Sequence, residues 1–494
     1  MGIIIRQSIK QSIVTYAGTL IGMVNILFIY PLVFTPAEQG LFRVLVDVGL
    51  LISPLMTLGI SGIVVRFFPD FKNETNGHNG YLGSLLSAEL CCFFISFLVL
   101  LPFIPKLIQL YAKGDAMLLQ YLWLAIAIGG ISMLTHLFSE YASNFGRIAI
   151  PAAINQCIKI MLPTLALLYY FKYISFQKVV YGYSTAFFIL LLMMIGYVKS
   201  LGQLFLRPNF SFITKGLRKS MMNYSLYAML GIIGTMLVIR LDAVMVAGMI
   251  NLHYTGVFTI GAFIAESIAV PSIALIKIAA PIISKAWAEN DIGEIKKVYE
   301  KSAVVLLMVG LFIFLNIWIN IDDVFRIMPN GKLYEAGKYV VLLLGISKLV
   351  DMATGVNNEV IGFSKWYNFN LMALLVLAAL NFCFNLWLIP LFHINGVALA
   401  SLLSLFLFNV TKLIFIKVKI GTQPLNRKTI LLLLISLLCY TICFKIAPTD
   451  MPIVNIILRS IILSILYISA VIYLNISEDV NRVVQNLQKR FISK

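Results

Sequence analysis

Long apolar runs separated by short polar stretches follow one another along the whole of this 494-residue chain. A helix that crosses a bilayer needs about 20 predominantly apolar residues, and about fourteen runs meet that criterion. The runs cover residues 12–33, 41–66, 81–104, 118–141, 149–171, 179–200, 221–241, 252–280, 300–320, 337–361, 367–390, 394–417, 429–447 and 452–474. The pattern predicts an all-α, polytopic membrane protein with about fourteen transmembrane helices.

The composition agrees with a membrane protein, since 60% of the residues are hydrophobic, 12% are charged and the mean hydropathy is +0.94. The net charge of +17 would also suit a nucleic-acid binder, but the basic residues stand in short loops between apolar runs. The most basic loops are 199–220, 281–301 and 417–428, together with the C-terminal tail. The positive-inside rule then places both termini in the cytoplasm, and no nucleic-acid partner is expected.

Several helix-breaking residues recur in one order at offsets of 214 to 217 residues. They are Gly40-Leu-Phe42 with Gly256-Val-Phe258, Pro54 with Pro271, Gly130-Ile-Ser132 with Gly345-Ile-Ser347, Gly146 with Gly362, and Gly182 with Gly396. Six helices are an even number, so two such repeats enter the membrane from the same side and are parallel. We expect lobes at 1–208 and 209–420, helix bends at Pro54 and Pro271, and two further helices in 421–476.

The last segment, 477–494, begins with Ser477 followed by two acidic residues, and it carries an apolar stripe that ends in basic residues. This pattern predicts an amphipathic helix on the inner leaflet. A solvated tail is the alternative.

Charged residues within the apolar runs are the candidate functional groups, because each costs at least about 2.5 to 3.5 kcal/mol at the centre of a bilayer. Cations that could line a polar cavity are Arg66, Lys159, Arg240, Lys277 and Lys348. Candidates for ion pairs or for proton or ion coupling are Arg43, Asp47, Glu89, His136, Glu140, Asp242, Glu266, Asp351 and Glu359. Helical spacing also allows structural salt bridges within Arg43/Asp47, His136/Glu140 and Lys348/Asp351. Lys412 and Arg459 are further charges within the runs.

The sequence lacks a phosphate-binding loop of the form G-x-x-x-x-G-K-[ST], and it contains neither HExxH nor GxSxG. Its six cysteines lie in apolar runs without a CxxC pair. We therefore expect no catalytic residue, no metal site and no cofactor, and a chain that is not an enzyme.

Three local sequences, combined with the repeat, resemble a known group of transporters. They are Gly40-Leu-Phe42-Arg43, Arg66-Phe67-Phe68-Pro69, and Arg240-Leu-Asp242 followed by Gly256-Val-Phe258. The chain is similar to the polysaccharide transporter branch, the Wzx-type lipid-linked oligosaccharide flippases, of the multidrug/oligosaccharidyl-lipid/polysaccharide (MOP) exporter superfamily.

The resemblance implies MATE-like, V-shaped lobes that open alternately to the two sides of a bacterial inner membrane. The cargo would be an undecaprenyl-diphosphate-linked oligosaccharide, such as an O-antigen, capsule or exopolysaccharide repeat unit. It would pass from the cytoplasmic to the periplasmic leaflet through a cationic central cavity. Implied partners are this lipid-linked oligosaccharide and membrane lipids, with glycan polymerases or assembly proteins as further candidates, and the expected state is a monomer.

Three other functions stay open at this stage: an ion-coupled drug or metabolite antiporter, a peptidoglycan lipid-precursor flippase, and a membrane glycosyltransferase. The first two groups are expected to carry charge in the first helix, whereas this chain has no charged residue between Lys10 and Glu38. The sequence does not specify the glycan, the coupling ion or the resting conformation.

Overall fold

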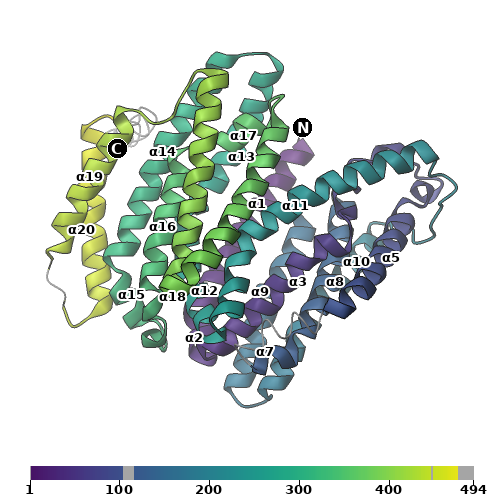
Figure 1. Cartoon of the computed structure of the whole chain (residues 1–494), viewed down its shortest axis with the longest axis horizontal. Helices are drawn as coiled ribbons and strands as arrows, with labels where there is room; N and C mark the ends of the chain where they lie inside the picture. The colour runs from purple at the N-terminus through teal and green to yellow at the C-terminus, as the bar shows by residue number, and fades with distance from the viewer. Residues whose placement is uncertain (1, 104–115, 447–448, 477–494) are drawn as a thin grey trace, which may run out of the picture. The chain divides into compact units, whose positions relative to one another are not determined.

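The computed structural model describes residues 2–103, 116–446 and 449–476, and the regular secondary structure in these ranges is entirely helical. The predicted amphipathic tail, 477–494, lies outside the described residues. The chain divides into two compact units, Met1–Thr259 and Ile260–Lys494, which we call unit 1 and unit 2. The helices of each are labelled in Figure 1.

Unit 1 contains long helices and several short ones. In chain order its α-helices are α1 (Gly2–Val24), α2 (Tyr30–Val33), α3 (Pro36–Met56), α4 (Phe68–Phe71), α5 (Tyr81–Leu100), α7 (Ala116–Tyr121), α8 (Trp123–Ser143), α9 (Ala149–Tyr170), α10 (Phe176–Ser200), α11 (Lys215–Met249) and the start of α12 (Leu252–Glu266). A π-helical turn, η1 (Asn25–Ile29), joins α1 to α2.

Unit 2 begins within α12 and ends with a pair of helices at the C-terminal side. Its remaining α-helices are α13 (Val270–Ala288), α14 (Ile292–Ile319), α15 (Ile321–Ile327), α16 (Lys338–Ala353), α17 (Asn357–Gly362), α18 (Tyr367–Ile420), α19 (Arg427–Phe444) and α20 (Pro452–Tyr473). Helices α14, α16 and α18 lie side by side in Figure 1.

Within the described ranges, twelve helices are long and apolar enough to cross a membrane. Two predicted spans, 367–390 and 394–417, both lie in α18, which is kinked at His393 (φ 52°, ψ −132°). The predicted span 337–361 is divided between α16, which has 16 residues, and the short α17. The predicted all-α, polytopic fold is confirmed, and fourteen is an approximate count of its helices.

Helix α3 illustrates how local sequence sets the ends of a span. Thr35 caps its start, since the Thr35 hydroxyl accepts a hydrogen bond from the Glu38 amide and Glu38 accepts one from the Thr35 amide. The helix ends at Met56, two residues after Pro54, where Leu58 (φ 49°) and Gly59 (φ 72°) turn the backbone into the left-handed region. The predicted span 41–66 is therefore interrupted after Met56, because proline removes a helical hydrogen bond.

The second predicted bend lies in the run 252–280. There α12 ends at Glu266, a 3₁₀ turn covers Ser267–Ala269, and Pro271 stands in the first turn of α13. The polar connection predicted at 281–301 is mostly helical, because the Asp291 carboxylate accepts a hydrogen bond from the Glu294 amide and so starts α14 early.

Most of the repeated glycines lie at close contacts, whereas a Cβ atom at Gly146 would meet nothing within 4 Å and one at Gly362 only Asn370, at 3.8 Å. A side chain at Gly40 would overlap the backbone of α12 at Leu252 and approach Gly256, and one at Gly256 would overlap the backbone of Pro36. Gly130 and Gly345 each receive a phenylalanine ring, from Phe93 and from Phe314. At these four positions the absence of a side chain permits close packing.

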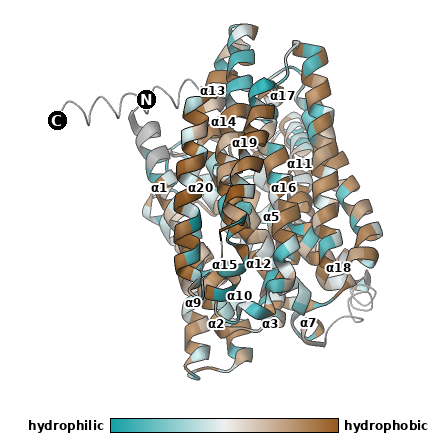
Figure 2. Ribbon diagram, turned by 90° about the vertical axis from the view of Figure 1, so that its left-hand side faces the viewer, coloured by the Kyte–Doolittle hydropathy of each residue, from teal (hydrophilic) through white to brown (hydrophobic). Residues whose placement is uncertain are grey.

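Each unit has its own apolar core, as expected when helices pack by van der Waals contact in lipid. Unit 1 buries Phe71, Tyr81 and Tyr141 in one cluster and Leu41 and Leu45 in another. In unit 2, cores form around α14 with α19 and α20, and around α13 with α17. Figure 2 shows hydrophobic residues along most of the length of the helices.

Candidate functional site

Asp47 of α3 is a fully buried acidic residue of unit 1, and its side chain is 0% exposed. It accepts a hydrogen bond at 2.5 Å from Nε of Arg43, one turn earlier, and a second from Nη1 of Arg240 on α11. The Arg43 and Arg240 side chains are 36% and 21% exposed. Sequence spacing predicted a pair of Arg43 with Asp47 and placed Arg240 separately among the cations; the structure brings all three together. Two guanidinium groups share one carboxylate, so this cluster, the Asp47 triad, carries an excess positive charge.

Lys159 of α9 lies against α1 at a glycine. A Cβ atom at Gly22 would stand 3.5 to 3.6 Å from Cδ, Cε and Nζ of Lys159, so the glycine makes room for the lysine stem. Asn25, in the π-helical turn, donates to the Lys159 carbonyl at 2.6 Å. Among the described residues, Lys159 has no ion-pair partner. Its ammonium group is half-buried and available to an anion.

Arg66 follows the break after α3 and is exposed. Its guanidinium carbon lies 4.1 Å from the centroid of the Tyr224 ring and 5.9 Å from that of Phe67, distances typical of cation–π contacts. No carboxylate of the described ranges pairs with it. Stacking leaves the N–H edge of a guanidinium free to bind an oxyanion.

In unit 2, Lys348 of α16 pairs with a different acid from the one that helical spacing allowed. Its Nζ lies 2.6 Å from Oε1 of Glu266 at the end of α12. Asp351, three residues after Lys348, instead accepts a hydrogen bond at 3.2 Å from Asn409 of α18. The candidate cation Lys348 therefore forms an ion pair that links α16 to α12.

A buried polar network surrounds the break between α16 and α17. Asn409 accepts hydrogen bonds at 2.9 Å from the Thr354 hydroxyl and from the Asn357 amide. Lys412, one turn further along α18, is 0% exposed and donates to Asn358, with its Nζ 4.0 Å from the centroid of the Phe408 ring. We noted Lys412 in the sequence only as a charge within an apolar run. Its spacing of three from Asn409 was the signal that could have identified this network.

The remaining candidates are more scattered. In unit 1, His136 and Glu140 are 3.7 Å apart with exposed side chains. Glu89 of α5 is fully buried, and neither of its carboxylate oxygens has a hydrogen-bond partner among the described residues. The structure places the rest as follows: Asp242 half-buried on α11, Lys277 exposed on α13 and Glu359 half-buried on α17.

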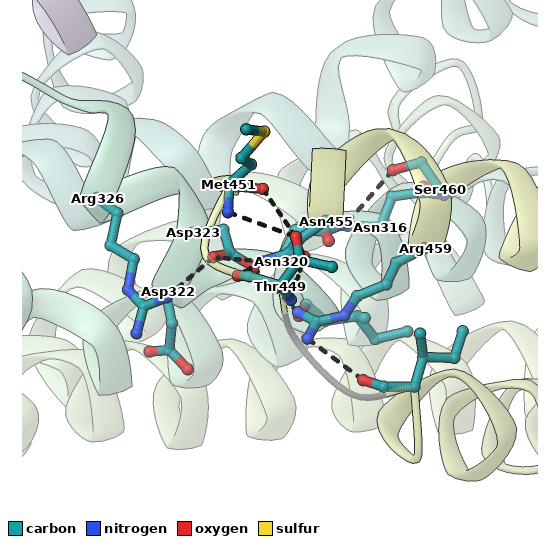
Figure 3. A network of polar contacts seen from close by, with 12 residues as sticks. Asn316, Asn320, Asp322, Asp323, Arg326, Thr449, Met451, Asn455, Arg459 and Ser460 are labelled. Carbon is teal, nitrogen blue, oxygen red and sulfur yellow. Dashed lines mark hydrogen bonds and ion pairs between the residues drawn. The ribbon is translucent and has the colours of Figure 1, made fainter. Parts of the chain in front are cut away.

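A second network, which the sequence did not predict, anchors the C-terminal helix pair and is drawn in Figure 3. Asp323 of α15 is 2% exposed and accepts from Arg459 at 3.1 Å and from Asn455 at 3.3 Å, both on α20. Arg326 also pairs with Asp323, at 3.5 Å. Oδ1 of Asn455 in turn accepts hydrogen bonds from the backbone amide and the hydroxyl of Thr449, at 2.7 and 2.6 Å. Arg459, met in the sequence as an isolated charge, is thus a structural residue.

Within the described ranges, no group of three or more His, Cys, Asp or Glu side chains is placed to hold a metal ion.

No protein-family model matches the chain. An uncharacterized membrane protein of Methanocaldococcus jannaschii is 22% identical over 436 residues, which make up 81% of each sequence. Three solved structures share the architecture at low identity. The lipid II flippase MurJ, in an inward closed conformation, matches with a TM-score of 0.74 and 13% identity over 94% of this chain and 98% of that chain.

An inward-facing multidrug resistance MATE family transporter of the MOP superfamily matches with a TM-score of 0.62 and 13% identity, over 82% of this chain and 94% of that chain. A MOP superfamily transporter from Pyrococcus furiosus matches with a TM-score of 0.54 and 12% identity, over 85% and 95%. On these likenesses, and with regular structure that is entirely helical in the described ranges, the chain has the fold of MOP superfamily transporters.

Proposed function

We propose that this chain is a flippase that moves an undecaprenyl-diphosphate-linked oligosaccharide from the cytoplasmic to the periplasmic leaflet of a bacterial inner membrane. The cargo would be a repeat unit of O-antigen, capsule or exopolysaccharide, and the movement would occur by alternating access. The chain would act as a secondary transporter without a cofactor.

The observation that carries this proposal is a set of cations in apolar surroundings that lack a full complement of carboxylates. Lys159 and Arg66 have no ion-pair partner among the described residues, and the Asp47 triad holds two guanidinium groups for one carboxylate. Such charges are costly in a membrane, and a diphosphate would compensate them with charge-assisted hydrogen bonds. The fold likeness to a protein described as a lipid II flippase supports the same class of cargo.

Further parts of this proposal rest on the sequence. We propose that Arg66, Lys159, Arg240, Lys277 and Lys348 face the cargo, that the lobes comprise 1–208 and 209–420, and that both termini are cytoplasmic. A monomer that works beside glycan polymerases or assembly proteins completes the proposal.

Charge variants in proteoliposomes test the proposal. An undecaprenyl-diphosphate oligosaccharide with a fluorescent label on the glycan is reconstituted, and dithionite, which cannot cross the bilayer, reports how much label reaches the outer leaflet. Lys159→Gln should slow this transfer at least about tenfold, as expected for loss of one charged hydrogen bond, whereas Lys159→Arg should retain most of it. The matched control is Lys419→Gln, at the exposed end of α18. Equal rates for Lys159→Gln and Lys419→Gln would contradict a role in cargo binding.

A cation- or proton-coupled drug antiporter is the second candidate function. The burial of Glu89 favours it. A buried carboxylate without a partner is suited to take up a proton or a cation. Under this alternative, Glu89→Gln would abolish efflux of a cationic dye driven by an imposed ion gradient. Wild-type vesicles that accumulate no dye under either a proton or a sodium gradient would exclude the antiporter.

A further inference from the structure

Unit 1 contains a cavity of about 390 Å³ beneath the connection that joins α10 to α11. Its walls come from the broken segment after α3, from the first half of α5 and from the first part of α11. They include Leu58, Ile63, Leu85, Met221 and Leu226, with Phe210 from the connection. Cavities that bind small ligands have volumes of about 300 to 1,000 Å³, so this one can admit a single narrow chain.

The hydroxyl groups in the wall are already occupied by the backbone. Tyr81 donates to the Ile63 carbonyl at 2.9 Å, and Ser225 donates to the Leu58 carbonyl at 2.5 Å. The Ser84 hydroxyl accepts the Asn209 amide at 3.1 Å. Because these groups have partners and the rest of the wall is mainly apolar, the cavity is suited to hydrocarbon rather than to a sugar or a polar drug.

One cation belongs to the lining. Arg218, in the first turns of α11, is exposed and has no carboxylate partner among the described residues. Lys215 and Lys219 flank it, and the first turn of α11 contains no acidic residue. Cations near a helix N-terminus are repelled by the positive end of the helix dipole. A bound anion would compensate both the charges of these basic residues and the helix dipole. The cavity thus combines an apolar interior with a positively charged edge.

We propose that this cavity binds one acyl chain of an anionic phospholipid, with the lipid phosphate held by Arg218 and the flanking lysines. The size of the cavity favours an acyl chain over the much longer isoprenoid of an undecaprenyl carrier. None of the five cations proposed to face the cargo lines this cavity. Phe210 belongs to the connection between α10 and α11. A lipid chain in contact with Phe210 and with α5 would therefore also stabilise the position of that connection against α5.

Lipid titration of the delipidated full chain, followed by native mass spectrometry, tests this site. The probes are phosphatidylglycerol, phosphatidylcholine and undecaprenyl phosphate. One saturable phosphatidylglycerol site is expected, and Arg218→Gln should weaken it about fivefold, the effect of losing one basic residue near a membrane surface. Arg427→Gln is the matched control, because Arg427 also begins a capped helix and is exposed but does not line the cavity.

Two filling variants test the interior of the cavity. Ala88→Phe fills the cavity from α5, and Met222→Trp fills it from an exposed position of α11. If one of these variants does not fold, the other still tests the proposal. Each folded variant should lose the saturable site for phosphatidylglycerol. Unchanged binding in every variant would overturn the proposal, since the lipid would then lie only on the outer surface. Displacement of phosphatidylglycerol by undecaprenyl phosphate at lower concentration would also overturn it, in favour of an isoprenoid occupant.

Discussion

Replacing Asp47 by asparagine removes the one carboxylate that two guanidinium groups share. The Asp47 side chain is 0% exposed, so the charges of Arg43 and Arg240 would lose their partner in a buried position. Breaking a buried ion pair typically costs about 3 to 5 kcal/mol. Arg43 is 36% exposed and can turn towards a more polar region, which places the expected loss near the lower limit, about 3 kcal/mol.

The assay is equilibrium unfolding in mixed micelles with increasing mole fraction of SDS, read as the free energy of unfolding. Asp322→Asn is the matched control, because Asp322 pairs with Lys338 at 2.6 Å but its side chain is 66% exposed. Exposed pairs contribute about 1 kcal/mol or less, so this variant should differ little from wild type.

A double variant separates the ion pair from a change in packing. The double variant, Asp47→Asn with Arg240→Gln, leaves only the Arg43 charge without a partner. Its loss of unfolding free energy should therefore be smaller than the sum of the losses in the two single variants. A coupling free energy of about 1 kcal/mol or more is expected for such neighbours. The reasoning is refuted if Asp47→Asn is as stable as Asp322→Asn, or if the two losses are simply additive.

Two further predictions concern helix packing. Gly40→Leu should abolish recovery of monodisperse protein in size-exclusion chromatography, because the new side chain would overlap α12. The control Gly196→Leu should be tolerated, since nothing lies within 4 Å of its Cβ position. Equal recovery of the two variants would contradict the close contact at Gly40. Arg459→Gln should speed protease cleavage between α19 and α20 several-fold, because Asp323 loses the less exposed of its two arginine partners. The control Arg326→Gln should have little effect, because the Arg326 side chain is 58% exposed. Equal cleavage rates for these two variants would show that Arg459 does not anchor the helix pair.

The sequence predicted features that depend on local composition and on repetition. Apolar runs of sufficient length identified the spans, and the echoed Gly40 and Gly256 proved to lie at one close contact between α3 and α12. Such positions are predictable because a shared backbone requires small residues at the same places.

Ion pairs between distant segments were not predictable in the same way. Arg240 meets Asp47 across 193 positions, and Lys348 pairs with Glu266 rather than with the nearby Asp351. Helical periodicity determines only which residues share a face, while the choice between possible partners depends on how the helices pack. Asp323 was overlooked because it stands in a short connection, where an acidic residue normally faces water.

The central claim of the account is that the chain translocates a lipid-linked oligosaccharide. The most direct measurement compares, in the same proteoliposomes, dithionite access to a glycan-labelled undecaprenyl-diphosphate oligosaccharide and gradient-driven uptake of a cationic dye. The account predicts that the wild-type protein accelerates movement of the glycan between leaflets over protein-free vesicles and does not move the dye. Dye transport without any acceleration of glycan movement would contradict it.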